Sequence, residues 1–334
     1  MAVTSPYCVN CVKTRRFNRR GSGSRSFAAF VAFSVLSFGI PAVSAAYETG
    51  RAEFSVQVND DLVIPYRVFA IYVLPSERIS LSASATDARA DSGALLSAGP
   101  GQWQWTAPEG AGVAELRFSN GSDEVRINAV IMHPAEQVVD GRLNGYRIDS
   151  YPESLNGEPV YTAPDGFIEL TSELIDLELS PHFRLGQFPS KQSTALPKYL
   201  LLRESLLLKL ELLLERLNEV GIEADSFTVM SGYRTPMYNR AIGNGQHSRH
   251  IYGGAADIYV DVSPRDDVMD DLNGDGRFDY RDAQWLYGLA DELFGLPEYG
   301  EFRGGLGVYR RNSVHGPFLH VDARGRRARW GLIP

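Results

Sequence analysis

Residues 248–257 constrain the fold of this chain more than any other stretch, because they hold two metal-type ligands that one helix face cannot bring together. His250 and Asp257 are separated by more than the three or four residues that make side chains neighbours on a helix. A loop must therefore fold around a metal ion, and Gly253-Gly254 provides the permissive backbone for it. The residues that follow, 255–262, have the composition of a strand, which places Asp257 near the start of that strand.

The third ligand of this predicted site is His320, which lies in a second predicted strand, residues 318–323. Two imidazoles and one carboxylate suit a zinc ion that keeps one coordination position open for water. The sequence therefore predicts a catalytic-type zinc site formed by His250, Asp257 and His320. His247 is the alternative to His250 as the first histidine ligand, because it lies only three residues earlier.

These residues carry a resemblance to a known family. The pattern Ser-x-His-x-x-Gly-x-Ala-x-Asp in 248–257, followed by a late histidine, resembles the zinc D-Ala-D-Ala peptidases, which share their fold with the Hedgehog signalling domain. Ser231-Gly232-Tyr233-Arg234 and the stretch 305–322 look most like the murein endopeptidase K branch. The resemblance covers roughly residues 140–330 and implies zinc-dependent cleavage of bacterial cell-wall peptides. It also implies that Arg234 lies beside the zinc and helps to hold the substrate.

The general base is not fixed by this pattern. The better-characterised branches of the family place an acidic residue three positions before the last ligand, where this chain has Pro317. Asp322 is the leading candidate, because strand alternation puts it on the same side as His320. It can act there as a base or as a carboxylate that orients the ligand imidazole. His315 and Glu301 are the other candidates.

Residues 271–282 fit the template of a twelve-residue calcium loop of the dockerin or EF-hand type. That template places oxygen ligands at positions one, three, five, seven, nine and twelve, and a glycine at position six. The matching residues are Asp271, Asn273, Asp275, Arg277 (through its backbone carbonyl), Asp279 and Asp282, with Gly276 at the turn. We predict a structural calcium site inserted between the zinc ligands and followed by a helix over 283–294. A solvated acidic turn is the alternative.

Residues 1–46 have the features of an export signal. They carry six basic and no acidic residues, an apolar run over 27–40, and small residues that favour cleavage near Ala46. The apolar run is shorter than the ~20 residues of a spanning helix, although a membrane anchor is the alternative. We therefore expect export to the periplasm or cell envelope, with no stable membrane span after cleavage.

The charge of the chain argues against nucleic-acid partners. The whole sequence has a net charge of -8, and removal of residues 1–46 leaves 27 basic against 41 acidic residues. Such an acidic surface repels a polyanion. The four arginines that follow the last zinc ligand are the basic exception, and they suit either substrate carboxylates or the protein's own acids. They are Arg324, Arg326, Arg327 and Arg329.

The predicted fold class is α+β, with a small all-β domain before the zinc domain. Short alternating strands over 47–135 predict an immunoglobulin-like β-sandwich. The Gly/Pro/Asn-rich stretch 136–166 predicts an inter-domain linker. Residues 167–334 form the Hedgehog/DD-peptidase-like zinc domain, with a leucine-rich core helix over 197–220. His182 is expected to be structural.

Together these features predict an exported zinc peptidase that hydrolyses peptidoglycan stem or cross-link peptides, as an endopeptidase or a carboxypeptidase. One alternative is a non-catalytic cell-wall-binding or scaffold protein that retains the metal site. A second is a calcium-dependent adhesion module, which leaves the His/Asp/His set unexplained.

Overall fold

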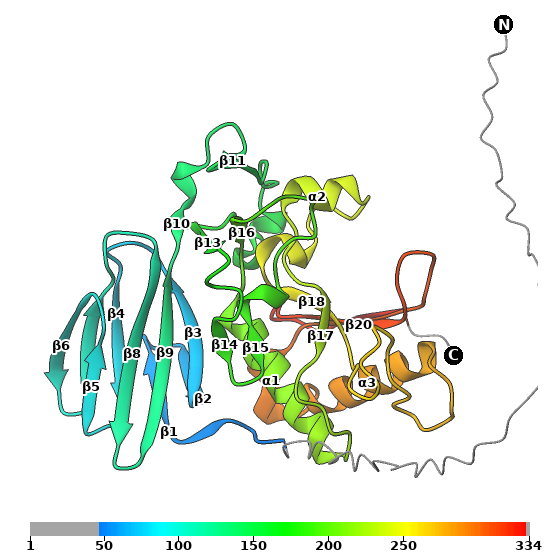
Figure 1. Ribbon diagram of the computed structural model, residues 1–334, viewed down its shortest axis with the longest axis horizontal. Coiled ribbons are helices and arrows are strands. Elements are labelled where there is room, and N and C mark those ends of the chain that lie inside the picture. The colour runs from blue at the N-terminus through cyan, green and yellow to red at the C-terminus, as the bar shows by residue number, and fades with distance from the viewer. Residues whose placement is uncertain (1–46, 332–334) are drawn as a thin grey trace, which may run out of the picture. The chain divides into compact units, whose positions relative to one another are not determined.

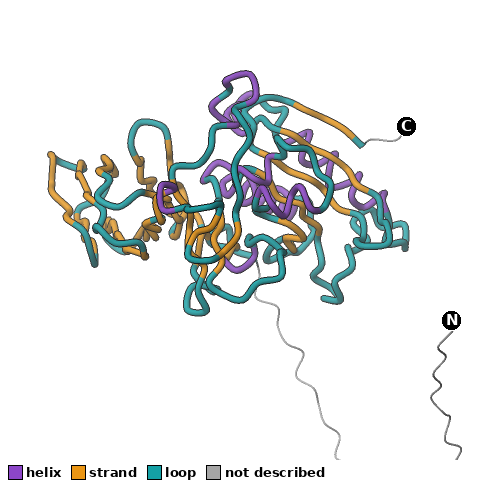
Figure 2. Tube along the Cα trace, turned by 90° about the horizontal axis from the view of Figure 1, so that it is seen from above, coloured by secondary structure: helices purple, strands orange, loops and turns teal. Residues whose placement is uncertain are grey.

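The computed structural model describes residues 47–331, so the predicted export signal at 1–46 lies outside the described residues. This part of the chain is mixed α/β, with many strands and few helices (Figures 1 and 2). None of its helices is long and apolar enough to cross a bilayer.

Two sheets form the first part of the described chain. One has the strand order β2-β1-β4-β7-β6 and the other the order β3-β9-β8-β5, in which β3 and β9 are parallel. The strands of the first sheet are β1 (Arg51–Val58), β2 (Leu62–Tyr66), β4 (Arg78–Ala83), β6 (Ala94–Gly99) and β7 (Gln102–Thr106). The strands of the second are β3 (Val68–Val73), β5 (Asp87–Ala90), β8 (Gly112–Asn120) and β9 (Asp123–Ile131).

The two sheets bury apolar faces against each other, as the alternation of the sequence predicts. Trp103 of β7 meets Phe118 of β8 edge-on, with ring centroids 5.4 Å apart. Trp105 is fully buried, and its indole N–H donates to the carbonyl of Ser92 at 3.0 Å. Trp105 therefore belongs to this core, and Trp103 is half-buried against it.

The segment predicted as a linker, 136–166, contains short strands and 3-10 turns. Its Tyr151 hydroxyl lies 2.9 Å from the hydroxyl of Tyr233, and Ile148 accepts a backbone hydrogen bond from Met237. It is therefore packed onto the part that carries the site. Its elements are η1 (Ala135–Gln137), β11 (Arg142–Leu143), β12 (Tyr146–Arg147), η2 (Leu155–Gly157) and η3 (Pro159–Tyr161).

Short elements on both sides of this segment complete the middle of the chain. A three-stranded sheet has the order β10-β13-β16, and β14 pairs with β15. These elements are β10 (His133–Pro134), β13 (Gly166–Leu170), β14 (Glu178–Ser180), β15 (Phe183–Arg184), η4 (Leu185–Gln187) and β16 (Lys198–Leu200).

A five-stranded sheet carries the predicted zinc ligands. Its order is β17-β18-β20-β19-β21, with β19 and β21 parallel and the other pairs antiparallel. The strands are β17 (Thr228–Ser231), β18 (Ala255–Tyr259), β19 (Gly305–Tyr309), β20 (Phe318–Asp322) and β21 (Ala328–Trp330). The register pairs Asp257 directly with His320, so two ligands distant in the sequence become cross-strand neighbours.

The helices lie near this sheet, with α3 in contact with β19 and β20 and with α1 (Figure 1). They are α1 (Glu204–Glu219), α2 (Pro236–Ala241), η5 (Arg249–Tyr252), α3 (Tyr280–Leu293) and η6 (Pro297–Phe302). The predicted start of the core helix at Pro197 is wrong. Residues 198–200 pair as β16 with β13, because Leu200 lies opposite Ile168, and α1 begins only at Glu204.

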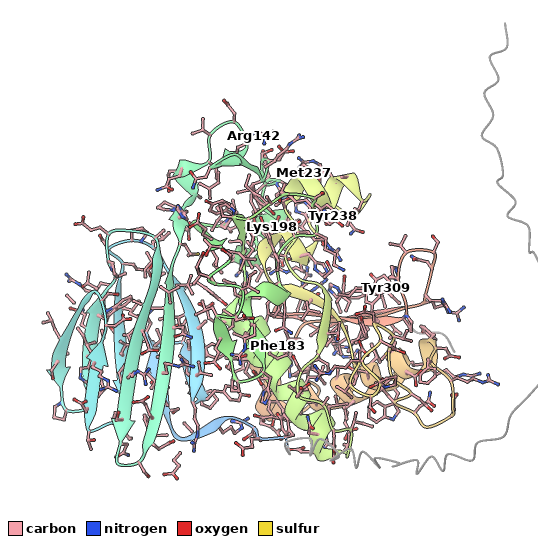
Figure 3. All side chains as sticks on the ribbon, viewed as in Figure 1. Arg142, Phe183, Lys198, Met237, Tyr238 and Tyr309 are labelled. Atoms are coloured by element: carbon pink, nitrogen blue, oxygen red, sulfur yellow. The ribbon has the colours of Figure 1, made fainter. Side chains whose placement is uncertain are left out.

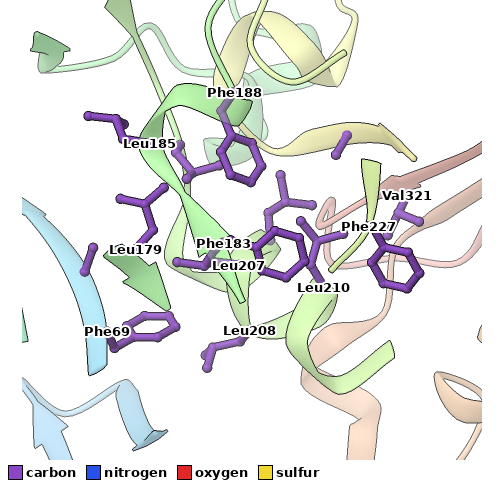
Figure 4. Packing of buried hydrophobic residues seen from close by; sticks show 14 of the residues in the cluster. Phe69, Leu179, Phe183, Leu185, Phe188, Leu207, Leu208, Leu210, Phe227 and Val321 are labelled. Atoms are coloured by element: carbon purple, nitrogen blue, oxygen red, sulfur yellow. The ribbon is translucent and has the colours of Figure 1, made fainter. Parts of the chain in front are cut away.

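A continuous apolar core joins these elements. Figure 4 shows it running from Phe69 of β3, past Leu179 and the leucines of α1, to Val321 of β20. The buried leucines of α1 are Leu206, Leu207, Leu208, Leu210, Leu212, Leu213, Leu214 and Leu217. Each contributes about 1.5–3 kcal/mol through burial, so α1 anchors the strands that hold the site.

Candidate active site

Three predicted ligands meet at one point of the five-stranded sheet. The Nε2 atom of His250 lies 3.2 Å from Nδ1 of His320 and 3.2 Å from Oδ1 of Asp257. The Nδ1 atom of His320 lies 2.8 Å from the same Asp257 oxygen. All three side chains are buried, and these atoms form a small triangle.

The loop that delivers His250 depends on a glycine. The short helix η5 carries His250 and ends at Gly253, which has a φ of 65° in the left-handed region. A Cβ atom at that position would lie 2.6 Å from the backbone carbon of Leu201. Only glycine suits both the conformation and the space, so Gly253 fixes the turn that brings His250 to Asp257.

Each imidazole is oriented by a partner on its far nitrogen. The Nδ1 atom of His250 lies 2.7 Å from the carbonyl oxygen of Gly232, which can only accept, so Nδ1 donates and Nε2 is left as a free acceptor. The Nε2 atom of His320 lies 3.3 Å from Oδ2 of Asp322, which leaves Nδ1 facing Asp257 and His250. Metal-binding histidines are held by carbonyls and carboxylates in this way.

The pKa shifts within the triangle differ in sign: burial would lower the pKa of His320, but its hydrogen bonds with Asp257 and Asp322 raise it above its ordinary value. Burial lowers the pKa of His250, which keeps its imidazole neutral and able to coordinate. Burial alone would raise the pKa of Asp257, but the two neighbouring imidazoles hold it well below its ordinary value. The carboxylate is therefore ionised, as a ligand must be.

The donor set fits zinc. Tetrahedral coordination with bonds of ~2.0–2.1 Å places neighbouring ligand atoms about 3.3 Å apart. Two separations in this triangle, both 3.2 Å, are close to that value, and the third, between His320 and Asp257, is shorter at 2.8 Å. Three protein ligands leave the fourth position free, which distinguishes a catalytic zinc site from a closed structural one. Among the described residues, this is the only group of at least three His, Cys, Asp or Glu ligand atoms within 4.8 Å of one another.

A cavity of about 660 Å³ opens onto the three ligands. Tyr238 of α2 and Tyr309 of β19, both labelled in Figure 3, line it together with His247 and His315. Among the described residues that line it, Asp257 is the only carboxylate. The cavity is thus open enough for a peptide but supplies no second acid next to the metal ligands.

Arg234 lies where the resemblance places it, beside the metal ligands. Its Nε donates to the hydroxyl of Ser231 at 2.9 Å, and its Nη2 donates to Oδ2 of Asp257. Arg234 also lines the cavity. It therefore holds the ligand carboxylate and presents the rest of its guanidinium to whatever occupies the cavity.

Asp322 lies behind His320 and does not line the cavity. Its carboxylate is fully buried and accepts from the backbone N–H of Gly305 at 2.8 Å and from Nε of Arg324 at 2.9 Å. Burial would raise its pKa, but His320 and Arg324 hold that pKa far below its ordinary value. This geometry favours the orienting role for Asp322 over the predicted role as general base.

Of the other two candidate bases, His315 lines the cavity and Glu301 does not. His315 lines the cavity, with Nδ1 2.7 Å from the carbonyl of Gly316 and Nε2 2.8 Å from the amide nitrogen of Asn312. Glu301 lines a different cavity, together with Arg203 and Glu204, and is not placed to reach the metal ligands. His247 stays outside the ligand triangle but lines the same cavity as His315.

The remaining predicted groups have structural partners. His182 contacts Glu211, with 2.7 Å between Nδ1 and Oε2. Arg326 pairs with Glu158, and both Arg327 and Arg329 pair with one acid, Asp291. Of the four late arginines, only Arg324 lines the cavity.

The calcium-type loop is shaped by hydrogen bonds of its own acids. The carboxylate of Asp271 accepts from the amides of Gly274, Asp275 and Gly276, and Asp279 caps α3. The last predicted ligand, Asp282, is buried and accepts from three backbone amides. The acids of this loop therefore do not gather their oxygens around one point as the zinc-type ligands do.

Several cavity residues were not identified as site residues from the sequence, and three of them lie close to the predicted ligands or to Arg324. Tyr161 comes from the supposed linker, Arg249 from a variable position of the motif, and Trp330 from β21. The ring of Trp330 lies 5.1 Å from that of His320. Only the position of Arg249, directly before a ligand, could have drawn attention to it.

The buried His/Asp/His centre, open to a cavity, is of the kind that hydrolytic zinc enzymes use. A model of the Peptidase M15 family matches residues 202–280, which include His250 and Asp257 but end before His320. The match supports the M15 family of zinc D-Ala-D-Ala peptidases, and not one branch of it. Searches of curated proteins and of solved structures returned no match.

Proposed function

We propose that this chain is an exported zinc peptidase that hydrolyses peptidoglycan stem or cross-link peptides. The observation that carries the proposal is the triangle of His250, Asp257 and His320, which lines a cavity of about 660 Å³ and in which each imidazole has one nitrogen held by a partner. A zinc ion in such a site supplies a Lewis acid that polarises a peptide carbonyl and acidifies water.

The chain's own residues would do the rest. Arg234 keeps Asp257 in place and offers its remaining donors to a substrate oxygen or carboxylate. Asp322 keeps His320 in its coordinating tautomer. His315 and His247 are the two imidazoles outside the ligand triangle that line the cavity, and Nε2 of His315 must give up its hydrogen bond from Asn312 before it can take a proton.

The test is to incubate the zinc-loaded protein with purified peptidoglycan and to identify released peptides by mass. We expect cleavage by the wild type, and loss of both zinc and cleavage in His250→Ala and His320→Ala. His133→Ala is the matched control, because His133 pairs with Gln137 away from the site. Binding to peptidoglycan without cleavage would instead indicate the non-catalytic wall-binding protein, an alternative favoured by the lack of a second acid in the described cavity wall.

Calcium binding by residues 271–282 is a further part of this proposal, supported by the sequence template alone. If calcium binds, it stabilises the folded chain by mass action. The melting temperature is expected to rise in millimolar calcium for the wild type and not for Asp275→Ala. If the melting temperature of the wild type does not rise, residues 271–282 form an acidic turn that does not bind calcium.

A further inference from the structure

Arg249 is a buried arginine with donors that no described residue satisfies. Only 2% of the residue is exposed, and its Nη1 donates to the carbonyl of Val160. Its Nε and Nη2 atoms, which carry three N–H groups, have no hydrogen-bond partner among residues 47–331. Burying a cation without pairing its donors is costly, so this arrangement calls for an anion that completes it.

The side chain is held in place by contacts that leave those donors free. Its Cζ atom lies 4.9 Å from the ring centroid of Tyr161 and 5.2 Å from that of Tyr252. Such cation–π contacts steady a guanidinium without using its N–H groups. A Cβ atom at Gly254 would lie 2.7 Å from Nη2, so the second glycine of the motif makes room for this guanidinium.

The surroundings of Arg249 are positive. Burial, followed by the nearby charge of Arg203, lowers the pKa of Arg249 to about 10. The charge of one acid, Asp322, raises the pKa of Arg249. The carboxylate of Asp322 already accepts hydrogen bonds from Nε and Nη2 of Arg324. The positive charge near Arg249 is therefore not balanced by a free acid of this part of the chain.

Arg249 and its neighbours line the cavity that holds the metal ligands. Tyr161 and Arg324 belong to the same wall, and Arg249 directly precedes His250 in η5. An anion held there would lie in the same cavity as a peptide bond presented to the ligand triangle. Arg234 is less available for this task, because its Nε and Nη2 are already bonded to Ser231 and Asp257.

We propose that Arg249 forms a carboxylate subsite that recognises an acidic group of the substrate peptide close to the scissile bond. The inference rests on the proposed peptidase function for the identity of the ligand as a peptide. A purely structural role for Arg249 accounts for the contacts with Val160, Tyr161 and Tyr252, but it leaves three N–H groups unexplained.

The test compares two synthetic wall-stem peptides that differ in one group. One carries a free carboxylate next to the bond that the wild type cleaves, and the other carries a carboxamide there. If no cleavage is seen, each free carboxylate of the stem is amidated in turn. Dissociation constants are measured by calorimetry on the zinc-loaded protein, and cleavage is measured separately, so that recognition and catalysis are scored independently.

The wild type is expected to bind one acidic peptide about 10- to 100-fold more tightly than its amide, as for hydrogen bonds to a charged group. Arg249→Met should remove this difference while binding the amide as the wild type does, and Arg249→Lys should keep part of it. Arg326→Gln is the matched control, because Arg326 pairs with Glu158 and does not line the cavity. It should discriminate like the wild type.

Two results would overturn the inference. Equal binding of every acidic peptide and its amide by the wild type shows that no carboxylate is recognised. If Arg249→Met binds the acidic peptide more tightly than its amide by the same factor as the wild type, another residue recognises the carboxylate. If Arg249→Met does not fold, the same conclusion follows when Arg249→Lys keeps both the full factor and the affinity of the wild type. Discrimination in binding without any cleavage supports the subsite and defeats the peptidase proposal, so the two failures are distinguishable.

Discussion

Replacing Asp322 with asparagine is expected to weaken zinc binding and folding more than the catalytic step itself. Asp322 does not line the cavity and contacts His320 from behind, with 3.3 Å between Nε2 and Oδ2. The change keeps the size of the side chain but removes the negative charge that faces His320 and Arg324. It therefore separates a carboxylate that orients His320 from one that takes a proton.

The structure sets the size of each effect. Loss of a partner that orients a metal ligand costs ~10–100-fold in metal affinity or activity. The same change leaves Arg324, whose side chain is 19% exposed, without its buried counter-charge. Breaking a buried ion pair by removing one partner costs about 3–5 kcal/mol of folding stability. Loss of a general base would instead cost ~10²–10⁴-fold in turnover, with zinc retained.

The assay measures zinc affinity by competition with a chelator, and turnover at saturating zinc. We expect Asp322→Asn to bind zinc ~10–100-fold more weakly, to melt at a lower temperature, and to recover turnover to within about tenfold of the wild type when zinc saturates. Asp261→Asn is the matched control, because Asp261 is also buried but bonds only to loop amides. Unchanged zinc affinity with turnover lowered by 10²-fold or more would refute this reasoning and restore Asp322 as the base.

Two other predictions follow from the ion pairs. Arg234→Gln should lower kcat/KM by about 10- to 100-fold at saturating zinc, because it removes charge-assisted donors to Asp257 and to substrate. Weaker zinc binding with unchanged kcat/KM at saturating zinc would indicate that Arg234 has a purely structural role. Burial would lower the pKa of His182, but the hydrogen bond and charge of Glu211 raise it above its ordinary value. The pair therefore stabilises the fold fully below about pH 6.5 and loses this effect as the pH rises through the folded-state pKa. Melting curves of wild type and His182→Gln should converge at high pH, and equal differences at pH 5.5 and 9 would contradict the assignment.

Much of the ligand set could be predicted from the sequence because it depends on spacings between residues that are close along the chain. The spacing of His250 and Asp257 around two glycines defines a loop, and strand alternation relates His320 to Asp322. The register that sets Asp257 opposite His320 is a pairing of distant strands, and the family resemblance supplied that ligand. The other relations depend on backbone periodicity, which a sequence displays directly.

What could not be predicted depends on contacts between distant segments. Tyr161 reaches the cavity because residues 136–166 pack onto the part of the chain that carries the site. The late start of α1 follows from the pairing of Leu200 with Ile168, which helix signals near Pro197 do not reveal. The unpaired donors of Arg249 are visible only when its neighbours are in place, because a sequence does not show whether a charge is satisfied.

The glycines of β19 show how a resemblance in sequence becomes a physical requirement. A Cβ atom at Gly305 would lie 2.2 Å from Oδ2 of Asp322, and one at Gly307 would lie 2.2 Å from the indole of Trp330. Because Gly307 pairs with His320, any side chain there would displace the tryptophan that packs beside this ligand. The two glycines let β19 approach closely enough for Asp322 to hold His320 and for Trp330 to cover it. Their pattern in the sequence is therefore part of the metal site, although neither glycine can bind a metal.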